Sequence, residues 1–384
     1  MKNLNAFQGV RFPVVSHRLA LGLILICPFL FGACLFDSGV GPNRIPSNFN
    51  LTVLQNAKNP LAGTYDMDEG KSVVGLQFAF RSMNYAWEVD SNIESFHDQT
   101  GTYPALAGAY FDLSSQPKNL RTFLDAVRAK GCVPYVTLDP KDWDEPDMAL
   151  QKTFLGKILK GEFDAQLKSL AGALRDFQHP ILFRYAHEMN GEWYPYGGGG
   201  DADGDGKADG PEKFIQAWRH VHDLFATEGA SNLLWVFCPN AEDFPDRDWN
   251  RPFRYFPGVG YADLIFVDAY EHHDKRTTTL EQALDNFYNE MGHFLALRQS
   301  EGDSLLPAFG LGEFGTNRVE GGIKADWYLN SLDFVATDRR IKFHVLYNGQ
   351  NGKEDFSLRG LGEAIKSAYQ KTRFQFRLFD PLPN

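Results

Sequence analysis

Two glutamates directly follow apolar segments that are typical of buried strands. Glu188 follows ILFRYA at 181–186, and Glu313 follows LPAFGLG at 306–312. Because side chains alternate along a strand, each glutamate is expected on the same face as the residues two and four positions before it. These neighbours are Ala186 and Arg184 for the first glutamate, and Leu311 and Phe309 for the second. The pattern predicts two carboxyl groups that face one pocket.

Such a pair of carboxyl groups can cleave a glycosidic bond. One group, protonated, gives its proton to the leaving oxygen, and the other, ionised, attacks the anomeric carbon. A separation of ~5–5.5 Å would retain the anomeric configuration, and one of roughly 6.5–9.5 Å would invert it through an interposed water. The charge on Glu313 is expected to raise the pKa of Glu188, which makes Glu188 the acid. The alternative is that either glutamate forms a salt bridge at the rim of the fold.

The elements that must position these residues alternate regularly from residue 71 onward. Predicted strands begin at residues 73, 104, 132, 181, 232, 263, 306 and 341. Predicted helices cover 118–130, 162–177, 212–228, 279–299, 323–338 and 357–370, with a further candidate at 89–99. Continuous apolar strands that alternate with helices predict an α/β fold, the (β/α)8 TIM barrel, whose active site lies at the carboxyl ends of the strands. A doubly wound open sheet is the alternative.

The segments around both glutamates resemble glycoside hydrolase family 26. FRYAHEMNGEWYPY at 183–196 resembles the acid/base segment of that family, and GEFG at 312–315 resembles its nucleophile segment. Further similar segments are TGTYPALAG at 100–108, GEFD at 161–164 and AWRHVH at 217–222. The resemblance extends over about residues 71–370. It implies an endo-acting, retaining β-glycoside hydrolase built on a barrel.

The resemblance also implies roles for individual residues. Glu188 would be the catalytic acid/base after the fourth strand, and Glu313 would be the nucleophile after the seventh. His187 would contact the substrate or the acid, which requires the chain to bend at the end of the strand. A buried structural histidine is the alternative. Trp193 would form an aromatic wall of the cleft, and Tyr270 would hydrogen-bond the nucleophile.

Two further residues are expected to support the barrel or to indicate which substrate is cleaved. Arg184 is expected to point into the barrel toward a carboxylate partner, as structural support. Asp139 lies in VTLDP at 136–140, where mannanases of the family carry a histidine-containing segment. It would either contact sugar or cap a turn. Because this departure resembles members that act on mixed-linkage β-1,3-1,4-glucan, that glucan is the alternative to the expected substrate, β-1,4-mannan. A non-catalytic surface glycan-binding lipoprotein is the alternative of a different class.

An acidic segment, DADGDGKADGPE at 201–212, follows the predicted acid/base segment. It has the spacing of an EF-hand loop, with acidic residues at positions 1, 3, 5, 9 and 12 and glycine at position 6. The predicted calcium ligands are Asp201, Asp203, Asp205, Lys207 through its carbonyl, Asp209 and Glu212. The ion would stiffen the cleft wall, and no cofactor is expected for catalysis. A solvated acidic loop is the alternative.

Residues 1–33 have the order of a bacterial secretion signal. Basic residues precede an apolar run at 19–31, which is followed by Gly32-Ala33-Cys34. Because this ending resembles a lipoprotein signal, we expect Cys34 to be lipidated and to anchor the protein to the cell envelope, facing outward. Ordinary cleavage near Ala33 and a retained membrane helix are the alternatives. Residues 34–70 are expected to form a flexible tether to a catalytic domain at 71–384.

The net charge restricts which partners the protein can bind, and the cysteine spacing indicates whether the thiols are bonded. The net charge of -11 without a basic block argues against nucleic-acid binding, whereas a neutral polysaccharide is compatible with it. We expect a monomer. Cys132 and Cys238 have no metal-binding or redox spacing, and buried free thiols are expected in preference to a disulfide.

Overall fold

The structure, a computed structural model, describes residues 71–78, 85–199, 209–272, 278–301, 307–318, 322–351, 353–370 and 373–377. The predicted signal at 1–33 and the predicted tether at 34–70 lie outside these residues. Within the described ranges, no helix combines the length and the apolar character that crossing a membrane would need. The part that the structure describes is the predicted catalytic domain.

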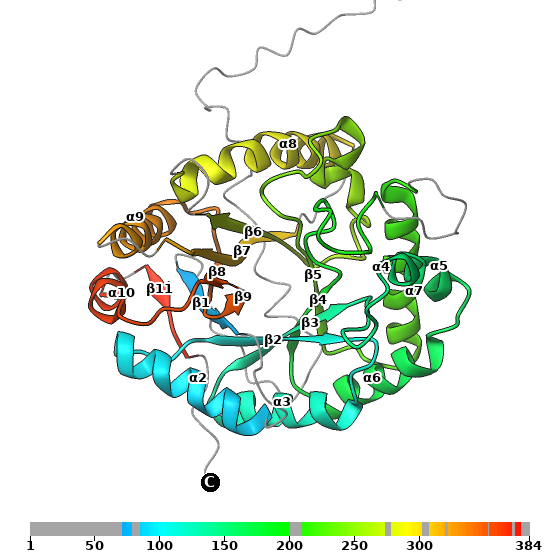
Figure 1. The fold of residues 1–384 in the computed structure, drawn as a ribbon, viewed down its shortest axis with the longest axis horizontal. Coiled ribbons are helices and arrows are strands. Elements are labelled where there is room, and N and C mark those ends of the chain that lie inside the picture. Colours follow the sequence, from blue (N-terminus) through cyan, green and yellow to red (C-terminus); the bar gives the residue numbers. More distant parts are fainter. Residues whose placement is uncertain are drawn as a thin grey trace, which may run out of the picture. The chain divides into compact units, whose positions relative to one another are not determined.

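Eight parallel strands form a closed barrel, which confirms the predicted fold (Figure 1). Each strand pairs with the next in sequence, and the first closes the sheet by pairing with the eighth. The strands are β1 (Ser72–Gln77), β2 (Leu106–Asp112), β3 (Val133–Asp139), β4 (Ile181–Tyr185), β5 (Leu233–Phe237), β6 (Leu264–Glu271), β7 (Ala308–Thr316) and β8 (Phe343–Tyr347). Nearly all of their residues are buried, because the inner face fills the barrel and helices cover the outer face.

Helices surround the barrel (Figure 1). The longer ones are α2 (Tyr85–Thr100), α3 (Pro117–Ala129), α6 (Asp164–Phe177), α7 (Pro211–Thr227), α8 (Leu280–Ser300), α9 (Ile323–Thr337) and α10 (Gly362–Tyr369). α3 illustrates the pattern: it begins at Pro117 and buries Leu120, Phe123, Leu124 and Val127, which share one face of the helix. The candidate at 89–99 belongs to the longer helix α2.

The predicted helix at 357–370 is wrong over its first five residues, because α10 begins only at Gly362. The Asp355 carboxylate accepts a hydrogen bond from the backbone N–H of Ser357 at 2.9 Å, and Gly360 has φ 78°. Both features favour a turn over a helix. The elements that the sequence did not predict are α4 (Met148–Gln151), α5 (Phe154–Leu159), the 3-10 turns η1 (Asp248–Asn250) and η2 (Pro252–Tyr255), the pair β9 (Gln350–Asn351) and β10 (Glu354–Asp355), and β11 (Phe374–Gln375) beside β1.

Aromatic side chains fill the layer between the strands and the helices. Phe183 of β4 packs edge-on against Trp235 of β5, with ring centroids 4.8 Å apart. Trp218 of α7 packs against the same strand. Cys132 and Cys238 are buried free thiols, which confirms the prediction. Burial raises the pKa of Cys132 to about 12, so this thiol stays protonated and packs as a small apolar group.

Candidate active site

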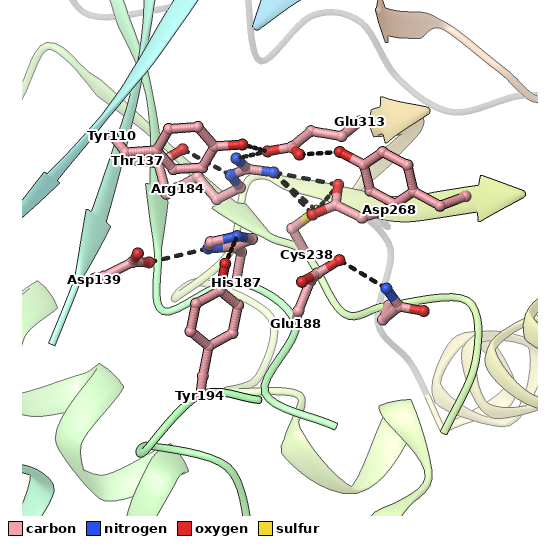
Figure 2. A network of polar contacts seen from close by, with 12 residues as sticks. Tyr110, Thr137, Asp139, Arg184, His187, Glu188, Tyr194, Cys238, Asp268 and Glu313 are labelled. Carbon is pink, nitrogen blue, oxygen red and sulfur yellow. Dashed lines mark hydrogen bonds and ion pairs between the residues drawn. The ribbon is translucent and has the colours of Figure 1, made fainter. Parts of the chain in front are cut away.

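The backbone bends sharply where β4 ends. The strand stops at Tyr185, and both Ala186 and Glu188 have left-handed φ values, 50° and 53°. Such values cost about 1–3 kcal/mol each in residues other than glycine, and they cluster at functional sites. The predicted alternation of side chains therefore ends before Ala186. This bend is the one that the family resemblance requires, and it brings His187 and Glu188 to the same site (Figure 2).

A β-bulge in β7 sets the direction of Glu313. Leu311 pairs with Val267 of β6 and Glu313 pairs with Asp268, so Gly312 is an extra residue. Because paired residues of neighbouring strands share a face, Glu313 shares a face with Asp268 and not with Leu311. This corrects the predicted alternation. A Cβ at Gly312 would overlap the Asp268 carboxylate, so the close approach of these strands requires glycine.

Three donors converge on the Glu313 carboxylate. Tyr110 donates to Oε1 at 2.6 Å, and Arg184 forms an ion pair with the same oxygen (Figure 2). Tyr270 donates to Oε2. Burial alone would raise the pKa of Glu313, but Arg184, His187 and the two tyrosines hold it below its usual range. The group is therefore ionised at neutral pH, as a carboxylate nucleophile must be.

Arg184 is fully buried, and two carboxylates compensate its charge. Besides Glu313, the guanidinium contacts the two oxygens of Asp268 at 3.0 and 3.2 Å, and its Nε donates to Thr137 at 2.8 Å. These contacts confirm that Arg184 points inward to a carboxylate partner. Burial raises the pKa of Asp268, and the charge of Arg184 opposes that rise. The guanidinium thus joins β4, β6 and β7 beneath the opening of the barrel.

Two neutral donors hold the Glu188 carboxyl. Asn240 Nδ2 donates to Oε1 and Trp193 Nε1 donates to Oε2, both at 2.7 Å. Burial raises the pKa of Glu188 above its usual range; the charge on Glu313 adds to this rise, whereas His187 and the two donors oppose it. The sequence analysis attributed the shift to Glu313, but burial is the larger cause. Glu188 is suited to hold a proton, as a general acid must.

Trp193 lies in the loop after β4, beside Glu188, and its side chain is 46% exposed. A Cβ at Gly191 would overlap the indole ring. Glycine at this position therefore permits the ring to lie across the backbone and reach the carboxyl group.

His187 is buried between two polar groups. Its Nδ1 lies 2.9 Å from Asp139 Oδ1, and its Nε2 lies 3.0 Å from the Tyr194 hydroxyl (Figure 2). Asp139 also pairs with Lys141 at 3.2 Å and accepts a hydrogen bond from Tyr196 at 3.0 Å. Burial alone would raise the pKa of Asp139, but His187 and Lys141 hold it well below its usual range. Because both of its oxygens are engaged and one of them contacts His187, this placement favours a positioning role for Asp139 over the sugar contact, which was one of its two expected roles.

A metal ion has two candidate places. His187, Asp268 and Glu313 each offer a ligand atom, and these atoms lie within 4.8 Å of one another. Because Arg184 already pairs with both carboxylates, a cation there would be repelled, and the residues do not fit a metal. Of the predicted calcium ligands, Asp201, Asp203, Asp205 and Lys207 lie outside the described residues, whereas Asp209 and Glu212 lie just before and within the first turn of α7.

Comparisons with known proteins find glycoside hydrolases, in agreement with the pair of carboxyl groups in the site. The family model described as glycosyl hydrolase family 26 matches residues 136–303. Endoglucanase H from Acetivibrio thermocellus is 24% identical over 283 residues, which cover 73% of this chain and 29% of that protein. Mannan endo-1,4-beta-mannosidase A and B from Caldalkalibacillus mannanilyticus is 34% identical over 165 residues, which cover 42% of this chain and 27% of that protein. The chain matches less than a third of the length of these two relatives.

The structure also resembles solved barrels. A double mutant of the Cellulomonas fimi endo-beta-1,4-mannanase superposes with a TM-score of 0.60 at 17% identity, covering 82% of this chain and 75% of that chain. At this identity the likeness concerns the fold alone. The family model, the relatives and the segments around Glu188 and Glu313 agree, and residues 136–303 of the chain match glycosyl hydrolase family 26.

Besides Thr137, which accepts a hydrogen bond from Arg184, sequence analysis missed three residues that contact the carboxyl groups or Arg184. They are Tyr110, Asn240 and Asp268. Tyr110 and Asp268 lie inside strands that were interpreted as apolar core, although both are near the carboxyl ends of those strands. Asn240 follows the predicted fifth strand by three residues. In a barrel, a polar residue at the carboxyl end of a strand is a signal for the active site, although it does not show which of these side chains point toward the site.

The ion pairs of Asp139 predict a pH-dependent loss of stability on substitution. Asp139→Asn removes one charge from a buried cluster, so we expect the free energy of unfolding at pH 7 to fall by about 3–5 kcal/mol. Because the folded-state pKa is lowered, this contribution is fully present above the unfolded value of about 4 and is lost as the pH falls toward the folded value. Urea unfolding at several pH values measures both effects.

Asp144→Asn, at an exposed position in the same loop, is the control and should change stability by less than about 0.5 kcal/mol. If Asp139→Asn were as stable as the wild type at pH 7, the structural role of the cluster would be refuted.

Proposed function

We propose that the chain is an endo-acting, retaining β-1,4-mannanase in which Glu313 is the nucleophile and Glu188 is the acid/base. The observation that carries this proposal is the pair of buried carboxyl groups with opposite pKa shifts at one opening of the barrel. The environment of Glu188 favours its protonated form, and the environment of Glu313 favours its ionised form. The match of residues 136–303 to the family model supports the role of Glu188, which lies within them.

In the first step, Glu188 gives its proton to the glycosidic oxygen while Glu313 attacks the anomeric carbon. The glycosidic bond breaks, the leaving sugar departs with the proton, and a glycosyl ester of Glu313 forms. Arg184, Tyr110 and Tyr270 keep the carboxylate ionised and oriented before the attack.

Once Glu313 is esterified, its negative charge is gone. The pKa of Glu188 then falls, because one of the contributions that raised it has been removed. Ionised Glu188 takes a proton from water, whose oxygen attacks the anomeric carbon and releases the sugar with its original configuration. Both steps use side chains of this chain, and we expect no catalytic cofactor.

β-1,4-Mannan is the proposed substrate because several relatives are mannan endo-1,4-beta-mannosidases. A β-glucan hydrolase is the second candidate, because the relative that aligns with 73% of the chain is an endoglucanase and because VTLDP at 136–140 departs from the mannanase pattern. Product analysis on mannan, mixed-linkage β-glucan and xylan distinguishes the two. Hydrolysis of the glucan alone would exclude mannan and leave the catalytic pair in place.

The catalytic roles predict large losses of activity from small substitutions. Glu188→Gln removes the transferable proton and should lower kcat/KM on mannan by about 10²–10⁴-fold. Glu313→Ala removes the nucleophile and should reduce activity at least as strongly. Release of reducing ends from mannan, lichenan and xylan measures both variants.

Glu192→Gln is a matched control, because Glu192 is exposed and lies in the same loop as Glu188. It should hydrolyse mannan like the wild type. Equal activity of all four proteins would refute the assignment of the pair. A wild type that binds mannan without cleaving it would support the non-catalytic alternative.

We also propose that the acidic segment at 201–212 binds calcium, on the strength of its EF-hand spacing. With a dissociation constant on the order of 10⁻⁴–10⁻³ M, calcium at ten times that concentration would stabilise the folded protein by about 1.4 kcal/mol and raise Tm by about 2–4 °C. A calcium titration of Tm in chelator-treated protein measures this, with Asp203→Ala as the variant expected to lose the response. A flat wild-type curve through millimolar calcium would refute the site.

The N-terminal pattern supports a further proposal, that the protein is secreted across the inner membrane and contacts the membrane only through a lipid anchor at Cys34. Cys34→Ser removes the thiol that would carry the lipid, so the protein should move from the membrane fraction to the soluble fraction. Fractionation of cells that express either form measures the change. Unchanged membrane partitioning of Cys34→Ser would contradict lipidation.

A further inference from the structure

Trp193 lies beside the carboxyl group of Glu188, and Phe244 lies next to Trp193; both aromatic side chains are partly exposed. Trp193 is 46% exposed and Phe244 is 56% exposed. Their rings are nearly parallel, with centroids 6.5 Å apart and an interplanar angle of 22°. Because the Trp193 indole donates to Glu188 Oε2, the pair is connected to the proposed proton donor through Trp193. The mechanism above assigns no role to Phe244.

The backbone around Phe244 is held in place by the loop that carries Glu188. The N–H of Phe244 donates to the carbonyl of Asn190 at 2.9 Å, and Asn190 Nδ2 donates to Asp243 at 2.8 Å. Arg251 in turn pairs with the other oxygen of Asp243 at 3.0 Å. These contacts join the loop after β5 to the loop after β4. The position of Phe244 relative to the acid/base is therefore fixed by the fold.

A large apolar side chain that is more than half exposed on a backbone held in place is not explained by folding, because burial of the ring would stabilise the protein. Rigid, exposed aromatic groups that gather beside polar catalytic groups are typical of ligand-binding surfaces. The flat faces of two such rings match the apolar C–H faces of a sugar. A sugar is therefore the ligand that this surface fits best.

We propose that Phe244, next to Trp193, binds the sugar ring on the leaving-group side of the bond that is cleaved. This inference rests on the proposed function. Glu188 must give its proton to the oxygen of the leaving sugar, so that sugar must lie against the groups around the Glu188 carboxyl. Trp193 is one of those groups, and the ring of Phe244 lies next to its indole.

The test compares two substrates that differ on the leaving-group side. Mannohexaose places sugar rings there, whereas β-mannobiosyl fluoride has a single atom as its leaving group. For Phe244→Ala, we expect kcat/KM on mannohexaose to fall about tenfold, mainly through a higher KM, which corresponds to about 1.4 kcal/mol of lost binding. On the fluoride, activity should stay within about twofold of the wild type. Phe244→Tyr, which keeps the ring, should restore hydrolysis of the hexaose.

Leu297→Ala is the matched control, because Leu297 is 49% exposed on α8. It should leave both substrates unaffected. Wild-type hydrolysis of the hexaose by Phe244→Ala would overturn the inference, and so would an equal loss on both substrates, which would indicate general disruption of the site. A wild type that cleaves neither substrate nor the corresponding glucans would instead refute the proposed function itself.

Discussion

Arg184 carries a positive charge in the interior of the barrel, where its side chain is fully buried. An uncompensated charge there would cost several kcal/mol, so the fold must supply carboxylates and further acceptors around it. Asp268, Glu313 and Thr137 meet this need from three different strands. The same contacts keep the proposed nucleophile ionised, so the stability of the barrel and the charge state of Glu313 depend on one guanidinium.

Glu188 lies in the same opening without such a partner. Neutral N–H groups of Asn240 and Trp193 hold it, and burial therefore dominates its pKa. The two glutamates thus differ because one is paired with a cation and the other is not. His187 stands beside both, and its contacts with Asp139 and Tyr194 fix the orientation of its ring. The site therefore depends on the residues that support Glu188 and Glu313 as much as on the two carboxyl groups themselves.

The barrel and the places of Glu188 and Glu313 could be predicted from the sequence, because doubly buried parallel strands appear as continuous apolar runs and the glutamates directly follow two of them. The directions of their side chains could not. The bulge at Gly312 and the left-handed φ of Ala186 interrupt the alternation that the prediction assumed. Tyr110 and Asp268 were hidden within strands, since a residue that points into the barrel and one that packs outward look alike in a fully buried run. The contact of Asn240 with Glu188 and the late start of α10 depend on contacts between loops. The periodicity of apolar residues in the sequence does not reveal such contacts.

The central claim is that Arg184 and the two tyrosines favour the ionised form of Glu313 while burial favours the protonated form of Glu188. The most direct measurement is a pH titration of the glutamate side-chain carboxyl carbons by ¹³C NMR, with the two signals assigned from Glu188→Gln and Glu313→Gln. The account predicts that Glu313 titrates below the ordinary glutamate value of about 4.3 and that Glu188 titrates above it. Titration of both groups near that value, or in the reverse order, would contradict the account.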